Sequence, residues 1–205
     1  LDNTDKVIEY SGECARLGIK VLPPDVNISN GGFTADNGKI RFGLNAVKNV
    51  GRNLIERVVE ERKEKPYSSL YDFCKRMHGT ELNRRAVECL IKAGAFDSMG
   101  VNRHSLVEAV DGIIKSVESD SRRNLEGQLD LFSVMGGESQ TADTDSYEIK
   151  PFPEYSHTEL LQQEKEVSGL YLSGHPLDAY REQSARFASN SIKELTGEDA
   201  HKLDG

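Results

Sequence analysis

The sequence predicts a mainly α fold with a small β element near the N-terminus and a partly disordered C-terminal region. Apolar residues recur at helical spacing through most of residues 52–117, the pattern of amphipathic helices. Asn37 and Gly38 lie between two short runs that can form strands, and this pair favours a tight hairpin turn. Residues 118–158 are rich in Ser, Asp, Glu, Gly and Thr, a composition typical of disordered chain.

The N-terminal part is predicted to hold one helix and the β element. Residues 2–17 carry apolar side chains at roughly helical spacing, and Gly18 ends that helix. Residues 19–22 are expected to form a short strand, and residues 33–34 and 39–42 flank the hairpin turn. A little β structure therefore precedes the helices.

The remaining elements are expected to be helices separated by turns. Asn83 and Asn102 stand where a side chain can cap a helix N-terminus. Helical spacing returns after the polar tract. The predicted helices are 44–47, 52–63, 69–77, 83–92, 102–117 and 158–172, with a short one starting near Asp178.

The segment from Leu90 to Arg103 reads LIKAGAFDSMGVNR and carries the strongest local signal. A helix end runs into residues 93–96, here called the second hairpin, and a new helix starts near Asn102. This layout is that of a helix-hairpin-helix, in which Gly94 lets the backbone turn tightly. We expect the amides of the hairpin and of the next helix to point outward, where they would bind a DNA phosphate.

Residues 45–52 repeat the plan, with a short helix, a turn and a long amphipathic helix; residues 48–52 are called the first hairpin. Asn49 stands where such a motif usually has its first glycine, and asparagine tolerates positive φ better than most residues. Two hairpins indicate a tandem helix-hairpin-helix domain that grips both strands of a duplex without reading its sequence. The alternative is that both are ordinary αα-hairpins that only pack in a bundle.

The candidate DNA-binding residues lie at these two turns or beside them. Val50 and Phe96 are expected to be buried pegs, and four basic residues would add positive charge. A Cβ at Gly51 or Gly94 is expected to strain the turn and weaken binding. The predicted set is Lys48, Asn49, Val50, Gly51, Arg52, Lys92, Gly94, Ala95, Phe96 and Arg103.

The distribution of charge favours a nucleic-acid partner more than the total does. The chain has a net charge of −8, but residues 39–115 hold 15 Lys and Arg against 10 Asp and Glu, a net of +5. The rest of the chain carries a net of −13. Local rather than total charge sets phosphate affinity, so the basic middle can serve DNA. A solvated surface of mixed charge is the alternative interpretation.

Several classes of protein are disfavoured. No run of 18 apolar residues and no signal peptide occurs, so no membrane partner is expected. The three cysteines form no CxxC pair, which favours free thiols in a reducing cytosol, and the five histidines lack zinc-ligand spacing. The start at Leu1 rather than Met indicates a piece of a longer protein.

Catalytic residues are not evident in the sequence. Asp25, Asp36, Asp72 and Asp97 are single carboxylates in turns or at helix edges, and 143–145 lies in the polar tract. No glycine-rich phosphate loop or Ser/His/Asp arrangement stands out. We therefore expect no catalytic residue, metal ligand or cofactor site in this chain.

A short apolar island interrupts the polar tract. It comprises Gln128, Leu129, Asp130, Leu131 and Phe132. The spacing is that of a linear docking motif, in which the last two side chains would fill an apolar pocket on a partner. The alternative is that this patch folds back onto the helices.

With these features in hand, the chain resembles the C-family of bacterial replicative polymerases, the alpha subunits of DNA polymerase III. The segments that carry the resemblance are 13–14, 18–29, 40–51, 90–103 and 171–177. The resemblance implies four regions: the end of a fingers domain at 1–35, the tandem helix-hairpin-helix domain at 36–117, a flexible loop with a sliding-clamp motif at 118–157, and a helical segment at 158–205 leading toward an OB-fold.

The resemblance also implies what the longer protein would do. It would extend primers with deoxynucleotides using two metal ions, expected to be Mg²⁺, held by aspartates upstream of Leu1. Its partners would be primer–template duplex, the beta sliding clamp at residues 128–132 and other replicase subunits, in the cytoplasm. A DNA-repair or scaffolding protein with the same hairpins, or a protein-binding adaptor without DNA contact, are the alternatives.

Overall fold

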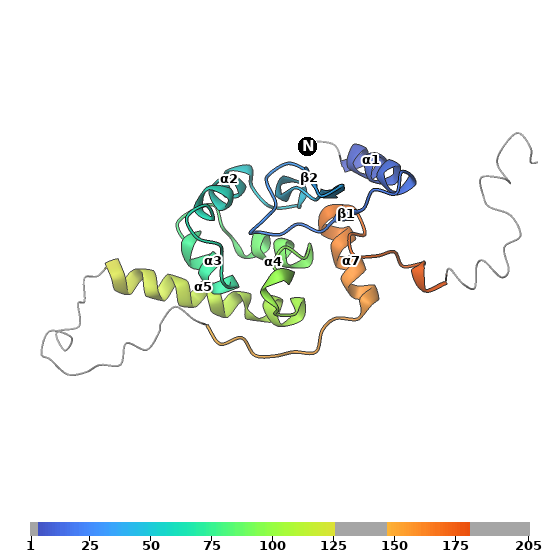
Figure 1. Cartoon of the computed structure of the whole chain (residues 1–205). Helices are drawn as coiled ribbons and strands as arrows, with labels where there is room; N and C mark the ends of the chain where they lie inside the picture. The colour runs from blue at the N-terminus through green and yellow to red at the C-terminus, as the bar shows by residue number, and fades with distance from the viewer. Residues whose placement is uncertain (1–3, 126–146, 181–205) are drawn as a thin grey trace, which may run out of the picture. The chain divides into compact units, whose positions relative to one another are not determined.

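The computed structural model describes residues 4–125 and 147–180, and it confirms a mainly helical fold with a small sheet near the N-terminus (Figure 1). Contacts divide the chain into two units, 1–173 and 174–205. The elements of the first unit are α1 Thr4–Arg16, β1 Val21–Leu22, β2 Thr34–Asp36, β3 Lys39–Arg41, η1 Leu44–Ala46, α2 Arg52–Glu61, α3 Leu70–Arg76, α4 Arg84–Lys92, η2 Asp97–Met99, α5 Arg103–Leu125 and α7 His157–Ser168. In the second unit, η3 spans Asp178–Tyr180.

The sheet has the strand order β1-β3-β2. β2 and β3 are antiparallel and joined by the predicted turn, in which Asn37 has φ 49° and Gly38 φ 77°. Positive φ at both positions is the requirement of the hairpin turn that an Asn-Gly pair favours, so this prediction is confirmed. β1 pairs with β3 in parallel, which places the segment after α1 against the hairpin.

Helix boundaries follow the capping residues closely. Ser69 and Asn83 accept hydrogen bonds from the third residue beyond them and so cap α3 and α4. α5 is longer than predicted, since it continues to Leu125 rather than ending near Val117. The apolar pattern ends near Val117, but residues 118–125 contain no glycine or proline that would stop the helix, so it continues.

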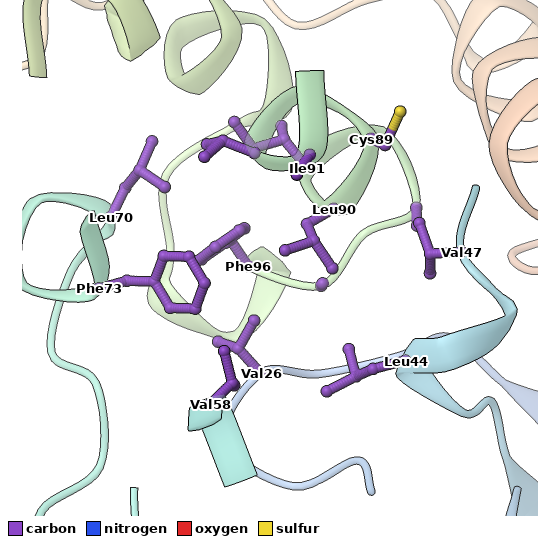
Figure 2. Packing of buried hydrophobic residues seen from close by; sticks show 14 of the residues in the cluster. Val26, Leu44, Val47, Val58, Leu70, Phe73, Cys89, Leu90, Ile91 and Phe96 are labelled. Carbon is purple, nitrogen blue, oxygen red and sulfur yellow. The ribbon is translucent and has the colours of Figure 1, made fainter. Parts of the chain in front are cut away.

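One apolar core joins these elements. Phe73 of α3 and Phe96 of the second hairpin are fully buried, with ring centroids 5.1 Å apart in an edge-to-face arrangement. Figure 2 shows these rings together with Leu90 of α4, Val58 of α2 and Val26. Aromatic and branched side chains from segments far apart in the sequence thus hold both hairpins against one interior.

Candidate nucleic-acid interface

The first hairpin lies at the surface between η1 and α2. Lys48, Asn49, Gly51 and Arg52 are exposed, and Val50 is partly buried against the core. Asn49 has φ 61°, so it adopts the left-handed conformation expected of the residue that replaces a glycine. Its Nδ2 donates to Cys89 Sγ at 3.3 Å, which attaches this turn to α4.

The backbone conformation at Gly51 does not require a glycine, in contrast to the prediction for the first hairpin. Gly51 is the N-cap of α2 with φ −71°, a conformation open to any residue, and as a glycine it supplies no side-chain cap. A Cβ at Gly51 would lie 2.9 Å from Glu81 Oε2, the movable end of an exposed side chain. The prediction that a Cβ here strains the backbone is therefore wrong.

Glu81 places a carboxylate beside the first hairpin, a feature that the sequence did not indicate. Its Oε1 accepts a hydrogen bond from Asn53 Nδ2 at 3.0 Å, in the first turn of α2. A carboxylate near a helix N-terminus is favourable for the helix but competes with a phosphate for the same partial positive charge.

The amides of the second hairpin are used within the fold. α4 ends in a Schellman motif, in which Gly94 N–H donates to the Ile91 carbonyl at 2.9 Å and Ala95 N–H to the Leu90 carbonyl at 2.9 Å. Gly94 has φ 83°, so the glycine prediction is confirmed at this position. The expectation that the Gly94 and Ala95 amides point outward to a phosphate is wrong, because both satisfy the last carbonyls of α4.

The N-terminus of α5 is also occupied from within the chain. Glu154 accepts from Arg103 N–H at 3.0 Å through Oε2 and from His104 N–H at 3.1 Å through Oε1. Asn102 caps the helix as predicted, since its Oδ1 accepts from Ser105 N–H at 2.8 Å. One carboxylate and one amide thus take three of the donors that a phosphate would use.

Arg103 is an internal residue rather than a surface cation. Its side chain is buried and pairs with Asp97 at 2.6 Å and with Glu164 at 3.0 Å. Burial alone would lower the pKa of Arg103, but the hydrogen bonds and charges of Asp97 and Glu164 outweigh it and raise the pKa. The expectation that Arg103 adds an open positive charge beside the hairpin is wrong, because its guanidinium is already paired and enclosed.

Two further predicted residues hold places in the packing. Phe96 is fully buried, as expected of a peg that holds the second hairpin. Lys92 is partly buried, and its Nζ lies 3.8 Å from Glu166 Oε2. The structure thus groups Lys48, Asn49, Val50, Gly51 and Arg52 at one open turn and places the second set within the fold.

Glu154 and Glu164 decide the environment of the second hairpin, although the sequence does not indicate this role for either residue. Each lies at least 51 residues beyond its partner Arg103 in the chain. Glutamates in a polar segment and in an amphipathic helix look like solvent-exposed residues, so no local pattern identifies them.

The remaining predictions concern the clamp motif, metal ligands and membrane-spanning helices. The candidate clamp motif, residues 128–132, lies outside the residues that the structure describes. Among residues 4–125 and 147–180, no three His, Cys, Asp or Glu side chains are grouped so as to hold a metal ion. In the same ranges, no helix is long and apolar enough to cross a bilayer.

Comparison with known proteins identifies the relatives of this chain. A family profile described as a helix-hairpin-helix motif matches residues 18–106. DNA polymerase III subunit alpha of Saccharopolyspora erythraea is 41% identical over 200 residues, 96% of this chain. The chain is a homologue of DNA polymerase III subunit alpha. Proteins of the same name from Borreliella burgdorferi (39% identical over 94% of this chain) and Escherichia coli K12 (36% over 91%) agree.

The match covers nearly all of this chain but a small part of each relative. The chain spans 17% of the alpha subunits of Saccharopolyspora erythraea and Borreliella burgdorferi and 16% of that of Escherichia coli. The matched profile contains both hairpins and the first residues of α5, and it ends before α7.

Proposed function

We propose that this chain holds duplex DNA as a segment of a bacterial replicative polymerase, and that the first hairpin is its main phosphate contact. The longer protein would extend primers with deoxynucleotides, with Mg²⁺ bound outside this segment. The observation that carries the proposal is the open first hairpin, where α2 begins at an exposed glycine without a side-chain cap. Amides at a helix start, next to exposed Arg52, suit a phosphate.

The second hairpin supports this function by packing. Its glycine closes α4, its aromatic residue is in the core, and its basic partner Arg103 is paired internally. For the second hairpin, this arrangement matches the alternative of an ordinary αα-hairpin that only packs. It does not extend to the first hairpin. The proposed DNA contacts are therefore Asn49, Val50, Gly51 and Arg52, since the amide and the Nζ of Lys48 are both bound to carbonyls of α7.

A duplex titration tests the DNA proposal. We expect a primer–template of arbitrary sequence to bind this chain at low salt and to bind more weakly as salt rises. Arg52→Gln should weaken binding, whereas Arg57→Gln, an exposed residue one and a half turns further along α2, should have a smaller effect. Absence of binding at low salt would instead favour the protein-binding adaptor, and a preference for branched or damaged DNA would favour a repair protein.

The second part of the proposal is a tether to the sliding clamp. Its support is the sequence at residues 128–132 and the homology to alpha subunits. A titration against the beta clamp should show micromolar binding, corresponding to about −8 kcal/mol. The triple change Gln128→Ala, Leu131→Ala and Phe132→Ala should abolish this binding. If the unmodified chain does not bind the clamp, the tether proposal fails.

A further inference from the structure

The last turn of α7 contacts the first hairpin directly. Lys48 N–H donates to the Val167 carbonyl at 2.8 Å, and Lys48 Nζ donates to the Glu166 carbonyl at 2.7 Å. Carbonyls at the end of a helix lack partners within the helix and carry partial negative charge. A lysine placed there satisfies two of them, so the first hairpin and α7 hold one another although 118 residues separate Lys48 from Glu166.

The same helix is linked to the second hairpin indirectly, through a buried carboxylate and Arg103. Glu164 is fully buried; its Oε1 accepts from Arg103 Nη1 at 3.0 Å, and its Oε2 accepts from the Leu172 and Ser173 amides at 2.8 and 2.9 Å. Arg103 also donates to Asp97 and to the Lys92 carbonyl, both near the second hairpin. Removing one partner of such a buried pair is costly, because the other charge stays enclosed.

We propose that α7 is a third component of the DNA-binding module and that Glu164 is a positioning residue, which holds the first hairpin at the orientation that a duplex requires. This inference rests on the proposed function of the first hairpin. The connection runs from Arg103 through Glu164 to α7, and from the last carbonyls of α7 to Lys48. The module thereby extends beyond residues 18–106, the range of the family profile.

This assignment explains where the predicted cations lie. Of the four basic residues expected at DNA, Lys48, Lys92 and Arg103 all contact α7. Arg52 remains exposed at the first hairpin. Part of the positive charge beside the hairpins therefore binds α7. These cations affect DNA binding by holding the first hairpin in place.

Two variants of α7 with equal charge test the proposal in the full 205-residue chain. Glu164→Gln removes the buried negative charge and one of its two acceptor oxygens, whereas Glu166→Gln changes an exposed side chain and leaves the Glu166 carbonyl available to Lys48. Two quantities are measured for each: affinity for a labelled primer–template duplex, and hydrogen exchange of residues 44–56 in the absence of DNA. Any effect of lost negative charge on DNA affinity is common to both variants.

We expect Glu164→Gln to weaken duplex binding about tenfold and to speed hydrogen exchange in the first hairpin. Glu166→Gln should leave exchange there unchanged and duplex binding equal or slightly tighter. Unchanged exchange in a folded Glu164→Gln protein would overturn the role of α7. If exchange responds but the unmodified chain binds no duplex, the coupling stands and the proposed DNA function fails.

A second variant covers the case in which Glu164→Gln does not fold. Lys48→Met removes the Nζ hydrogen bond from an exposed side chain, so the core is unaffected. Faster exchange both in residues 44–56 and in the last turn of α7, with α3 unchanged, is the expected result. No change in either segment would overturn the proposal.

Discussion

At the scale of single residues, Gly94 and Gly51 differ in whether their backbone conformation requires a glycine. Gly94 has φ 83°, and a Cβ there would lie 2.5 Å from Arg103 Nη2, which is paired with Asp97. Gly94→Ala should lower the free energy of unfolding by about 1–2 kcal/mol from backbone strain alone. Gly51→Ala should change it by less than about 0.5 kcal/mol, as at an ordinary surface position. Urea unfolding of both variants measures this difference, and equal losses would contradict it.

Glu81 gives a residue-scale test of the first hairpin as the phosphate site. Its carboxylate lies next to Gly51 and Asn53 and would repel an incoming phosphate. Glu81→Gln should tighten duplex binding about two- to fivefold, the range for one exposed charge. Glu148→Gln, an equal change of charge at an exposed residue of another segment, is the control. Equal effects of the two changes in a titration would argue against a phosphate at this turn.

Two buried groups predict a loss of stability at alkaline pH. Burial raises the pKa of the Cys74 thiol to about 12 and that of the Tyr67 phenol to about 12. Both groups are neutral when folded but ionise near pH 8.5 and 10 in unfolded chain, so their stabilising effect is complete below those values. Stability should then fall by about 1.4 kcal/mol per pH unit for each group as pH rises toward 12. Urea unfolding at several alkaline pH values measures the slope; a flat profile would contradict the burial of these groups.

At the scale of elements, α5 depends on a carboxylate from a distant segment. Glu154 binds the Arg103 and His104 amides and so neutralises the positive end of the helix. Glu154→Gln should cost about 0.3–1 kcal/mol and speed exchange of those two amides. Amide exchange measured by NMR provides the test, with Glu148→Gln again as the control. Unchanged protection would mean that Glu154 does not hold the start of α5.

Elements were predictable from sequence where short-range chemistry decides them. The Asn37-Gly38 turn, the Asn83 and Asn102 caps and the glycine after α4 were all identified from neighbouring residues. The occupants of the hairpin amides were not predictable, because Glu154 and Glu164 reach Arg103 across at least 51 residues. A motif therefore indicates which donors a turn offers, and only tertiary structure shows which of them remain free.

At the scale of the whole molecule, fewer cations beside the hairpins are available to DNA than the composition indicates. Residues 39–115 carry a net charge of +5, yet Lys48, Lys92 and Arg103 bind partners within the fold. Salt dependence of duplex binding should correspond to only about two to four phosphates, since each contact contributes about 0.9 to the logarithmic slope. Titrations over a series of salt concentrations give this slope. A value near that of six or more phosphates would require contacts beyond the first hairpin.

The first hairpin, and not the second, is the part of the molecule that we propose meets the DNA backbone. An NMR titration of the labelled chain with primer–template duplex, recorded amide by amide, tests this proposal most directly. We expect the largest shifts at Asn49, Val50, Gly51 and Arg52, with Gly94 and Ala95 nearly unchanged because their amides bind the end of α4. Shifts confined to Gly94, Ala95 and the start of α5 would contradict the account, since they would mean that DNA displaces Glu154 and that the second hairpin is the phosphate site.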